Sequence, residues 1–273
     1  MDEWEYSFIQ KQILQLTGVD LRSYKAPQMQ RRLEAYLKRS GYTDWPRFFR
    51  VVHKSPEERE KLKTYLTINV SSFFRDPHKY ETLKQKIIPQ LLAERDVLRV
   101  WSAGCSRGQE AYSIAMLLSE LCTPQQSFRI SATDIDKDAL AWAKAGGPYS
   151  ADDVQHVSSY LRLQYFEIKN GSFWIKKPLQ QNILFRPQNL LTDPMYGLFD
   201  LVVCRNVVIY FEVQAKLNIY QKFYKALRPG GVLFVGGTEI VPKAKELGFE
   251  LADLSFYRRP KPESRFKFTK PHS

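Results

Sequence analysis

From residue 97 onward the chain alternates between short apolar runs and amphipathic stretches, and this alternation is the feature that most limits its possible folds. Apolar runs occupy residues 97–101, 128–133, 199–204 and 231–235. Helical patterns follow the first two runs, over residues 109–121 and 136–145. Strands that alternate with helices form parallel βαβ units. We therefore expect residues 96–258 to form an α/β domain with a doubly wound, largely parallel sheet.

The first 76 residues have a different texture, in which apolar residues recur at helical spacing. One stripe lies within residues 8–16 and another within residues 29–37, just after Pro27, which is favourable in a first helical turn. We expect a small N-terminal helical domain over residues 1–76. A linking helix over residues 77–95 would join it to the α/β domain.

Two smaller segments interrupt this plan. Residues 150–185 break the alternation, and Asn170-Gly171 between two apolar runs is typical of a β-hairpin with a type I′ turn. We therefore expect a small inserted β-subdomain over residues 150–185. From Arg258 the sequence is basic and contains prolines, so we expect residues 259–273 to form a loose basic tail.

Charge and cysteine content narrow the function classes. The 273 residues carry a net charge of +12, which indicates an anionic partner without choosing between nucleic acid, membrane and acidic protein. The three cysteines lack metal-ligand spacing, which argues against disulfides and a zinc site and favours a reducing cytoplasm. No run approaches the ~18 apolar residues of a membrane span. The acidic N-terminus lacks the apolar core of a signal peptide.

The loop after the first expected strand, Gly104-Cys105-Ser106-Arg107-Gly108, is the most informative stretch. Glycines let a backbone turn tightly and approach a ligand, and ligands of open α/β sheets lie outside the carboxyl ends of the strands. Asp134 ends the second strand, where an acid can accept hydrogen bonds from ribose hydroxyls. The alternative is a tight turn followed by a helix N-cap at Thr133, Asp134 or Asp136. Turn and acid together favour a nucleoside-bearing cofactor.

Several sequence blocks resemble the CheR-type chemotaxis receptor methyltransferases. The main blocks are Thr-Ile-Asn-Val-Ser-Ser-Phe-Phe-Arg at 67–75, the stretch 101–113, and Cys-Arg-Asn-Val-Val-Ile-Tyr-Phe at 204–211. Residues 132–136 and 189–191 match as well, and the blocks stand in the family order over nearly the whole chain. The resemblance implies a helical N-terminal domain and a Rossmann-like S-adenosylmethionine-dependent methyltransferase domain with a small inserted β-subdomain.

The resemblance also implies a reaction. The family transfers a methyl group from S-adenosyl-L-methionine to glutamate side chains on the cytoplasmic helical region of chemoreceptors, in chemotactic adaptation. The products are a glutamyl methyl ester and S-adenosyl-L-homocysteine. Because a glutamate is already ionised at pH 7, this protein-glutamate O-methylation needs no strong general base. We expect a cytoplasmic enzyme whose partner is a chemoreceptor, without nucleic acid, metal or membrane insertion.

Site residues follow from the resemblance by position. Arg75 and Tyr210 would stand nearest the transferred methyl group. The cofactor would be bound by residues spread over the matched blocks: Asn69, Ser71, Arg75, Gly104, Glu110, Asp134, Asn189, Leu190, Arg205 and Asn206. In this set Glu110 would lie near the methionine amino group and Asp134 would hold the ribose.

Some of these residues have simpler alternative roles. Arg75 could pair with Asp76 on the surface, Tyr210 could belong to the core, and Asn69 could end a helix. Arg205 is different, because a charge directly after an apolar strand is expected to be buried and to need a partner.

The chain departs from the family pattern at three places. The family's Ser-Thr-Gly-Glu-Glu-Pro-Tyr is Ser-Arg-Gly-Gln-Glu-Ala-Tyr at 106–112, Ser71 replaces a usual threonine, and the hairpin is shorter. Glu110 is retained, but Gln109 lacks a carboxylate and Arg107 would put a cation beside the sulfonium pocket. That cation would weaken cofactor binding or attract an acidic substrate. The short hairpin resembles the pentapeptide-independent branch of the family.

The positive charge is concentrated in two segments. Residues 20–54 carry a net charge of +6 and residues 258–273 a net charge of +5, so the remaining chain is almost neutral. One expected helix contains Arg31, Arg32, Lys38 and Arg39. A solvated helix face is the ordinary meaning of such charges, but the family places this helix against the acidic methylation region of its receptor. We expect these four residues to dock the substrate.

Two other functions compete with this interpretation. An RNA methyltransferase would suit the basic composition, but the sequence shows neither a base-stacking platform nor a basic RNA-binding module. A non-catalytic adaptor that binds the cofactor would keep the fold and lose turnover through Arg107 and Gln109.

Overall fold

The computed structural model describes residues 1–67, 71–195 and 197–262. The N-terminal part is a helical domain of α1 (Glu3–Thr17), η1 (Leu21–Ser23), α2 (Ala26–Arg39), α3 (Trp45–Lys54) and α4 (Pro56–Leu66). Asp2, Asp44 and Ser55 cap α1, α3 and α4 by accepting backbone N–H bonds. Apolar residues from all four α-helices meet in one core, which includes Ile13, Leu33, Phe48 and Leu62.

The linking segment is helical, as expected, over α5 (Pro77–Thr82), η2 (Leu83–Ile87) and α6 (Ile88–Leu92). Leu83, Ile87 and Leu91 are buried in the same core as the first strands of the α/β domain. The linking helix therefore packs as part of the α/β domain.

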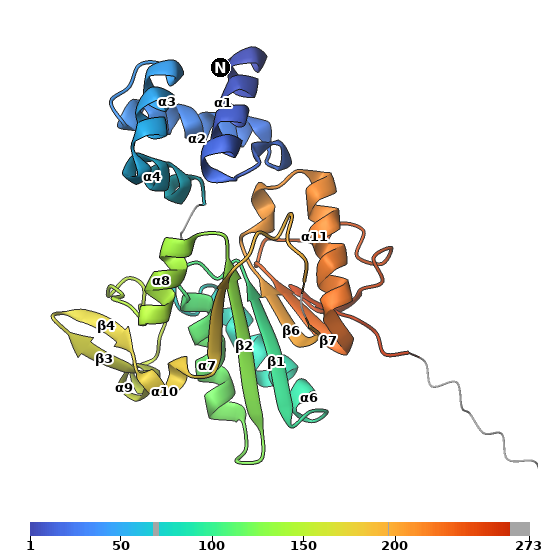
Figure 1. Cartoon of the computed structure of the whole chain (residues 1–273). Helices are drawn as coiled ribbons and strands as arrows, with labels where there is room; N and C mark the ends of the chain where they lie inside the picture. The colour runs from blue at the N-terminus through green and yellow to red at the C-terminus, as the bar shows by residue number, and fades with distance from the viewer. Residues whose placement is uncertain (68–70, 196, 263–273) are drawn as a thin grey trace, which may run out of the picture.

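A seven-stranded mixed sheet forms the centre of the α/β domain (Figure 1). Its strands are β1 (Val97–Ala103), β2 (Ser127–Asp134), β5 (Ile183–Pro187), β6 (Phe199–Cys204), β7 (Leu227–Val235), β8 (Glu250–Asp253) and β9 (Phe256–Arg258). The order is β5-β2-β1-β6-β7-β9-β8. The first five strands in this order are parallel, and β1, β2, β6 and β7 among them are the strands that the alternation predicts. At the edge β9 and β8 pair antiparallel.

Helices cover the two faces of the sheet unequally. On one face α6, α7 (Gln109–Leu121) and α8 (Lys137–Ala145) bury apolar residues against the strands. On the other face α11 (Val213–Ala226) packs over β6 and β7. The strand order reverses beside β1, so the carboxyl ends of β1, β2 and β6 open into the crevice where such folds bind ligands.

The inserted subdomain has the expected hairpin. It consists of α9 (Ser159–Tyr165), β3 (Phe166–Lys169), β4 (Ser172–Ile175) and α10 (Lys177–Gln180). Asn170 and Gly171 have φ of +50° and +74°, as a type I′ turn requires. The expected end of the insertion is wrong, because β5 begins at Ile183 and pairs with β2 in the main sheet.

The start of the tail is not loose, contrary to our expectation. Arg258 belongs to β9, and the Arg259 guanidinium donates to the Leu227 carbonyl at 2.7 Å. Lys261 forms an ion pair with Glu94 at 2.8 Å. These contacts hold residues 258–261 on the sheet domain, and the rest of the expected tail, 263–273, lies outside the described residues.

Among the described residues, hydrogen bonds at two places contribute to joining the helical domain to the α/β domain. Tyr24 and Phe211 form a short bridge, in which Lys25 N–H donates to the Tyr210 carbonyl at 3.0 Å and Glu212 N–H to the Ser23 carbonyl at 2.8 Å. Elsewhere Thr67 Oγ1 donates to Asp136 Oδ2 at 3.0 Å.

Among the described residues no helix is long and apolar enough to cross a membrane.

Candidate functional site

A cavity between the two domains brings together all the predicted catalytic and cofactor-binding residues that the structure describes. Its lining includes Ser71, Arg75, Gly104, Glu110, Asp134, Asn189, Leu190, Arg205, Asn206 and Tyr210. Tyr24, Leu66 and Thr67 close it from the helical domain. Asn69 lies outside the described residues. Residues as far apart in sequence as Tyr24 and Phe211 therefore meet in one place, at the carboxyl ends of the parallel strands.

Asp134 and Asp136 divide the two roles that the sequence left open. Asp136 caps α8 by accepting the N–H groups of Asp138 and Ala139. Asp134 instead lines the cavity, and its two oxygens accept the N–H groups of Ser106 at 2.7 Å and Asp136 at 2.9 Å. The N-cap alternative for Asp134 is therefore wrong. Its carboxylate is held in one orientation by the backbone, as a ribose-binding acid requires.

The glycine turn is shaped by the lack of a side chain at Gly104. This residue has φ of +83°, and a Cβ atom there would lie 2.6 Å from Val207 Cγ2. Its N–H donates to the Thr133 carbonyl at 2.8 Å, which ties the turn to the end of β2. The backbone can thus approach a ligand in the cavity closely.

Glu110 is a buried acid in the first turn of α7. Ser102 Oγ donates to its Oε1 at 2.8 Å, and its Oε2 lies 4.0 Å from Arg205 Nη1. Burial raises the pKa of Glu110 to about 7, although Arg205 and the Ser102 hydrogen bond act in the opposite direction. A carboxylate so poorly solvated gains from a positively charged ligand group, such as the ammonium group of a bound amino acid.

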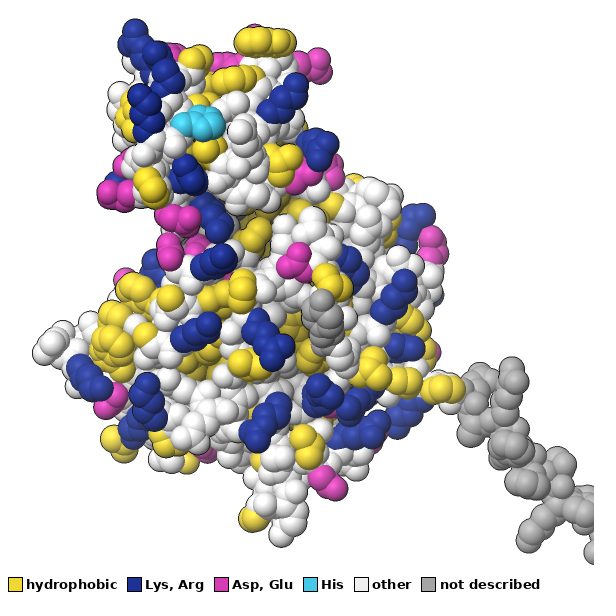
Figure 2. Space-filling view, viewed as in Figure 1, with side chains coloured by type: hydrophobic (Ala, Val, Ile, Leu, Met, Phe, Trp, Pro, Cys, Tyr) yellow, Lys and Arg dark blue, Asp and Glu magenta, His cyan; other side chains and the backbone are white. Residues whose placement is uncertain are grey.

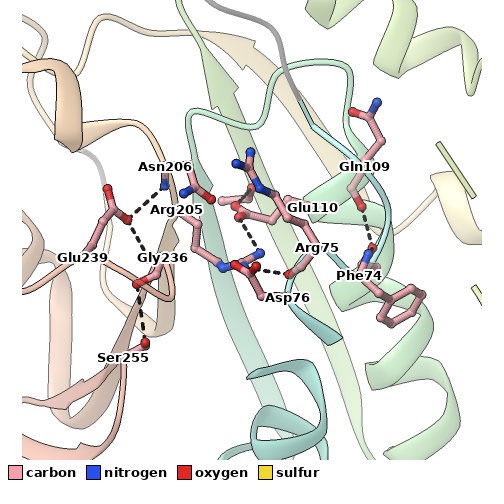
Figure 3. A network of polar contacts seen from close by, with 12 residues as sticks. Phe74, Arg75, Asp76, Gln109, Glu110, Arg205, Asn206, Gly236, Glu239 and Ser255 are labelled. Carbon is pink, nitrogen blue, oxygen red and sulfur yellow. Dashed lines mark hydrogen bonds and ion pairs between the residues drawn. The ribbon is translucent and has the colours of Figure 1, made fainter. Parts of the chain in front are cut away.

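The buried Arg205 guanidinium is partnered at its Nη2 atom, while its Nε has no hydrogen-bond partner among the described residues (Figure 3). Its Nη2 donates at 2.7 Å both to the Arg75 carbonyl and to Asp76 Oδ2. Its guanidinium also lies over the Phe234 ring, 4.8 Å from the centroid. Asp76 therefore pairs with Arg205, and these bonds hold the Arg75 backbone against the end of β6.

Asn206 depends on Glu239, a residue that the sequence did not single out (Figure 3). Asn206 has φ of +59°, which is uncommon outside glycine. Glu239 Oε2 accepts the N–H groups of Asn206 at 2.9 Å and Gly236 at 2.6 Å. Asn206 Oδ1 is buried and has no hydrogen-bond partner among the described residues. An acid soon after an apolar strand, as at Asp134, is the signal that could have identified Glu239.

Tyr210 and Asn189 both line the cavity, and Asn189 is placed by local hydrogen bonds. Tyr210 is half-buried and lines the cavity, so its expected alternative as a core residue is wrong. Asn189 Oδ1 accepts the Leu191 N–H at 3.0 Å, and Asp193 Oδ2 accepts the Asn189 N–H at 2.9 Å. These bonds shape the loop after β5 that lines the cavity.

The two departures in the glycine turn lie outside the cavity. Arg107 is exposed, and its guanidinium lies 4.6 Å from the Trp142 ring centroid. Gln109 Nε2 donates to Asp153 Oδ1 at 3.1 Å and to the Ser71 carbonyl at 3.4 Å. Neither side chain lines the cavity. The expectation that Arg107 sets a cation beside the sulfonium pocket is therefore wrong, and the adaptor interpretation loses its basis.

The four expected docking residues lie on α2 but differ in their surroundings. Arg31, Lys38 and Arg39 are exposed. Arg32 is half-buried, donates to the Tyr65 carbonyl and lies over the Tyr65 ring at 4.8 Å. Arg32 therefore ties α2 to α4.

Fold and site together define a class of enzyme. An open, largely parallel sheet presents a glycine turn, an oriented acid and a buried glutamate at its carboxyl edge. This arrangement is that of Rossmann-like domains that bind a nucleoside cofactor. Asp134 suits the ribose and Glu110 suits an ammonium group, and Asn206 Oδ1, which has no partner within the described part of the chain, could accept a hydrogen bond from a ligand.

Sequence comparisons name the family. The CheR methyltransferase SAM binding domain matches residues 69–256, and the CheR methyltransferase all-alpha domain matches residues 4–67. The chain therefore belongs to the CheR methyltransferase family, and its cofactor is S-adenosylmethionine.

Individual relatives agree with this assignment. A chemotaxis protein methyltransferase of Listeria monocytogenes is 36% identical, covering 93% of this chain and 97% of the relative. Chemotaxis protein methyltransferase 1 of Pseudomonas aeruginosa is 39% identical, covering 66% and 69%. Among solved structures, PKMT2 from Rickettsia typhi in complex with AdoHcy is 18% identical, covers 62% of this chain and 26% of that chain, and has a TM-score of 0.38. That likeness is too remote to bear on the site.

Proposed function

We propose that this chain methylates glutamate side chains in the cytoplasmic helical region of chemoreceptors and forms glutamyl methyl esters. The observation that carries the proposal is the single cavity in which Arg75 and Tyr210 meet the cofactor-binding residues. The relatives named as chemotaxis protein methyltransferases support the receptor as substrate. The short β3–β4 hairpin supports the pentapeptide-independent branch, and the reducing setting suggested by the cysteines supports the cytoplasm.

The roles of the chain's own residues follow from their places. Glu110, Asp134, Asn189, Leu190 and the Gly104 turn would bind the cofactor, with Ser71, Arg205 and Asn206 closing the cavity. When bound, the cofactor supplies an electrophilic methyl group on a sulfonium. Arg75 and Tyr210 would orient the acceptor carboxylate beside it.

Acid–base catalysis contributes little to such a reaction. The acceptor glutamate is ionised at pH 7 and gives up no proton on methylation. The residues therefore act by alignment and by excluding water, where orientation alone supplies roughly 7–11 kcal/mol. The helical domain contributes directly, because Lys25 fixes the backbone of Tyr210 and Tyr24 closes the cavity.

Transfer of labelled methyl to receptor-containing membranes tests the proposal. We expect label in the receptor that alkali releases as methanol, since carboxyl methyl esters are base-labile. Arg75→Ala and Tyr210→Phe should lower kcat by at least about tenfold while S-adenosylhomocysteine still binds. A base-stable product, or label in added RNA instead of receptor, would contradict the proposal.

A further inference from the structure

One half of a sheet face lacks the helical layer that the architecture calls for. On the face that carries Trp101, α11 covers β6, β7 and the Trp101 end of β1, whereas β2, β5 and the start of β1 have no helix over them (Figure 1). Trp101 identifies the face, because its ring packs against Phe223 of α11 at 5.3 Å. Doubly wound folds bury both faces of their sheet under helices. Within the described residues this part of the face is open to solvent.

Arginines occupy the open part. Arg99 on β1 pairs in register with Arg129 on β2, and Arg186 on β5 pairs with Thr133. All three arginines are exposed and share the face of Trp101. Figure 2 shows Lys and Arg side chains spread across this side of the α/β domain, with hydrophobic side chains between them. We call Arg99, Arg129 and Arg186, together with exposed Leu184, the arginine face.

The charges of the arginine face are not neutralised locally. The residues of β1, β2 and β5 on this face include no Asp or Glu. Among the described residues, the Arg129 guanidinium donates to a neutral group, Asn182 Oδ1, at 2.9 Å. The neighbouring acid, Asp200, is buried and shared between Arg95 at 3.8 Å and Arg228 at 3.4 Å. Like charges directly opposite in a sheet are unfavourable, so Arg99 and Arg129 side by side carry a cost that an anionic partner would relieve.

An apolar recess accompanies the charges. A cavity of about 230 Å³ opens beside Arg186, with Pro187, Pro194 and Phe199 in its wall. Leu184 and Leu198 nearby are 49% and 46% exposed. The acid at the cavity, Asp193, already accepts hydrogen bonds from Asn189 and Thr192. The arginine face thus offers charge together with a place for an apolar side chain.

The size and chemistry of the surface select its occupant. Three strands about 4.8 Å apart span about 10 Å, which is the width of one α-helix with its side chains. Guanidinium groups pair bidentately with carboxylates. The Trp101 ring is 2% exposed, so no aromatic platform is available for stacking bases. We propose that an acidic amphipathic helix of the chemoreceptor docks on the arginine face and supplies the missing layer.

This docking deepens the proposed function and rests on it. The recess and the cofactor cavity share Gln188, so the arginine face is continuous with the rim of the site. A receptor helix there would be a second contact besides α2. It would act on receptor binding and leave the chemical step alone.

The test compares two charge-reversal pairs with equal change in net charge. Arg129→Glu with Arg186→Glu removes the arginine face. Lys84→Glu with Lys86→Glu reverses two exposed lysines of η2, which packs on the opposite face of the sheet. We expect the first pair to raise the KM for receptor-containing membranes by at least about tenfold and the second to change it less than about twofold. Neither pair should change kcat or the calorimetric affinity for S-adenosylhomocysteine.

The outcomes separate this inference from the proposed function. Wild-type protein that forms no base-labile ester contradicts the proposed function itself. Wild-type activity with an unchanged KM in the Arg129/Arg186 pair overturns the docking, as does an equal rise of KM in both pairs, which would indicate only general electrostatic attraction. Loss of self-association in the Arg129/Arg186 pair without a change in receptor KM would also overturn it, since the occupant would then be a second copy of this chain.

Discussion

Glu239 accepts the backbone N–H of Asn206 at 2.9 Å, and this bond holds Asn206 in a left-handed conformation with its side chain at the cofactor cavity. Glu239 itself does not line the cavity. It is 7% exposed, and burial raises its pKa although the two backbone N–H groups it binds favour the ionised form. The residue is therefore placed to act on the site through the backbone of Asn206.

Removing this acceptor should weaken cofactor binding. In Glu239→Ala two buried N–H groups lose their partner, and Asn206 is no longer held at φ of +59°. We expect the affinity for S-adenosylhomocysteine to fall about tenfold in calorimetry. Glu239→Gln keeps an acceptor oxygen, so it should retain most of the wild-type affinity for S-adenosylhomocysteine. In a protein that already carries Asn206→Ala, Glu239→Ala should cause little further loss of affinity.

Asp200 offers a matched control at the opposite end of β6. It is a buried carboxylate that accepts a backbone N–H, that of Arg99 at 2.8 Å, but it lies away from the cavity. Asp200→Ala should lower Tm at least as much as Glu239→Ala and leave cofactor affinity unchanged. Equal loss of affinity in both variants would show that Glu239 acts only through stability.

Glu110 should couple cofactor binding to pH. Its folded pKa of about 7 exceeds the ordinary value of 4.5, so below pH 7 the buried side chain holds a proton. A cationic cofactor group favours the carboxylate and should displace that proton. We expect affinity to rise with pH up to about 7 and proton release at pH 6, measured by calorimetry in buffers of different ionisation enthalpy. Glu110→Gln should abolish the proton release; its persistence would assign the proton to another group.

The same pKa sets the direction of a stability effect without cofactor. Between pH 4.5 and 7 the folded state binds more protons at Glu110 than the unfolded state does, so this group's contribution to the free energy of unfolding falls as pH rises. The full difference is about 3 kcal/mol. Glu110→Gln should be stabilised relative to wild type at pH 8 and much less so at pH 4.5, as urea unfolding at both pH values would show.

Restoring the family glutamate at position 109 should destabilise this chain. Gln109 donates to Asp153 and to the Ser71 carbonyl. In Gln109→Glu a carboxylate would face another carboxylate and a carbonyl, at a cost of about 2 kcal/mol or more in urea unfolding. Adding Asp153→Asn should recover part of the lost stability.

Arg107→Thr restores the other family residue in this stretch. We expect its cofactor affinity to stay within about twofold of the wild-type value, because the Arg107 side chain lies outside the cavity.

Arg31 and Arg32 should behave differently although they are adjacent. Arg32→Glu breaks the contacts with Tyr65 and should lower stability by about 1–2 kcal/mol. Arg31→Glu with Lys38→Glu changes only exposed groups, so we expect unchanged Tm and a higher KM for receptor membranes. If this pair leaves receptor methylation unchanged, α2 is not a docking helix.

Local sequence patterns predicted much of the fold, and the family resemblance predicted the residues of the site. The alternation after residue 96 predicted β1, β2, β6 and β7, and Asn170-Gly171 predicted the hairpin, because periodicity and turn chemistry can be recognised within a short stretch of sequence. The antiparallel edge formed by β8 and β9 was missed, since both strands are short and find their partners only once β7 is in place.

In the sequence, chain order and periodicity indicated which residues end the parallel strands, and the family resemblance assigned residues to the cavity by position. Which partner each of these side chains and their neighbours binds was decided by the tertiary structure. Asp136 and not Asp134 caps a helix, Arg107 turns to Trp142, Arg32 binds Tyr65, and Glu239 supports Asn206. The near-neutral charge of the α/β domain conceals Arg99, Arg129 and Arg186 on one open face. The physical reason is that periodicity specifies which side of an element a residue occupies, whereas partners and surface charge depend on elements that meet only after folding.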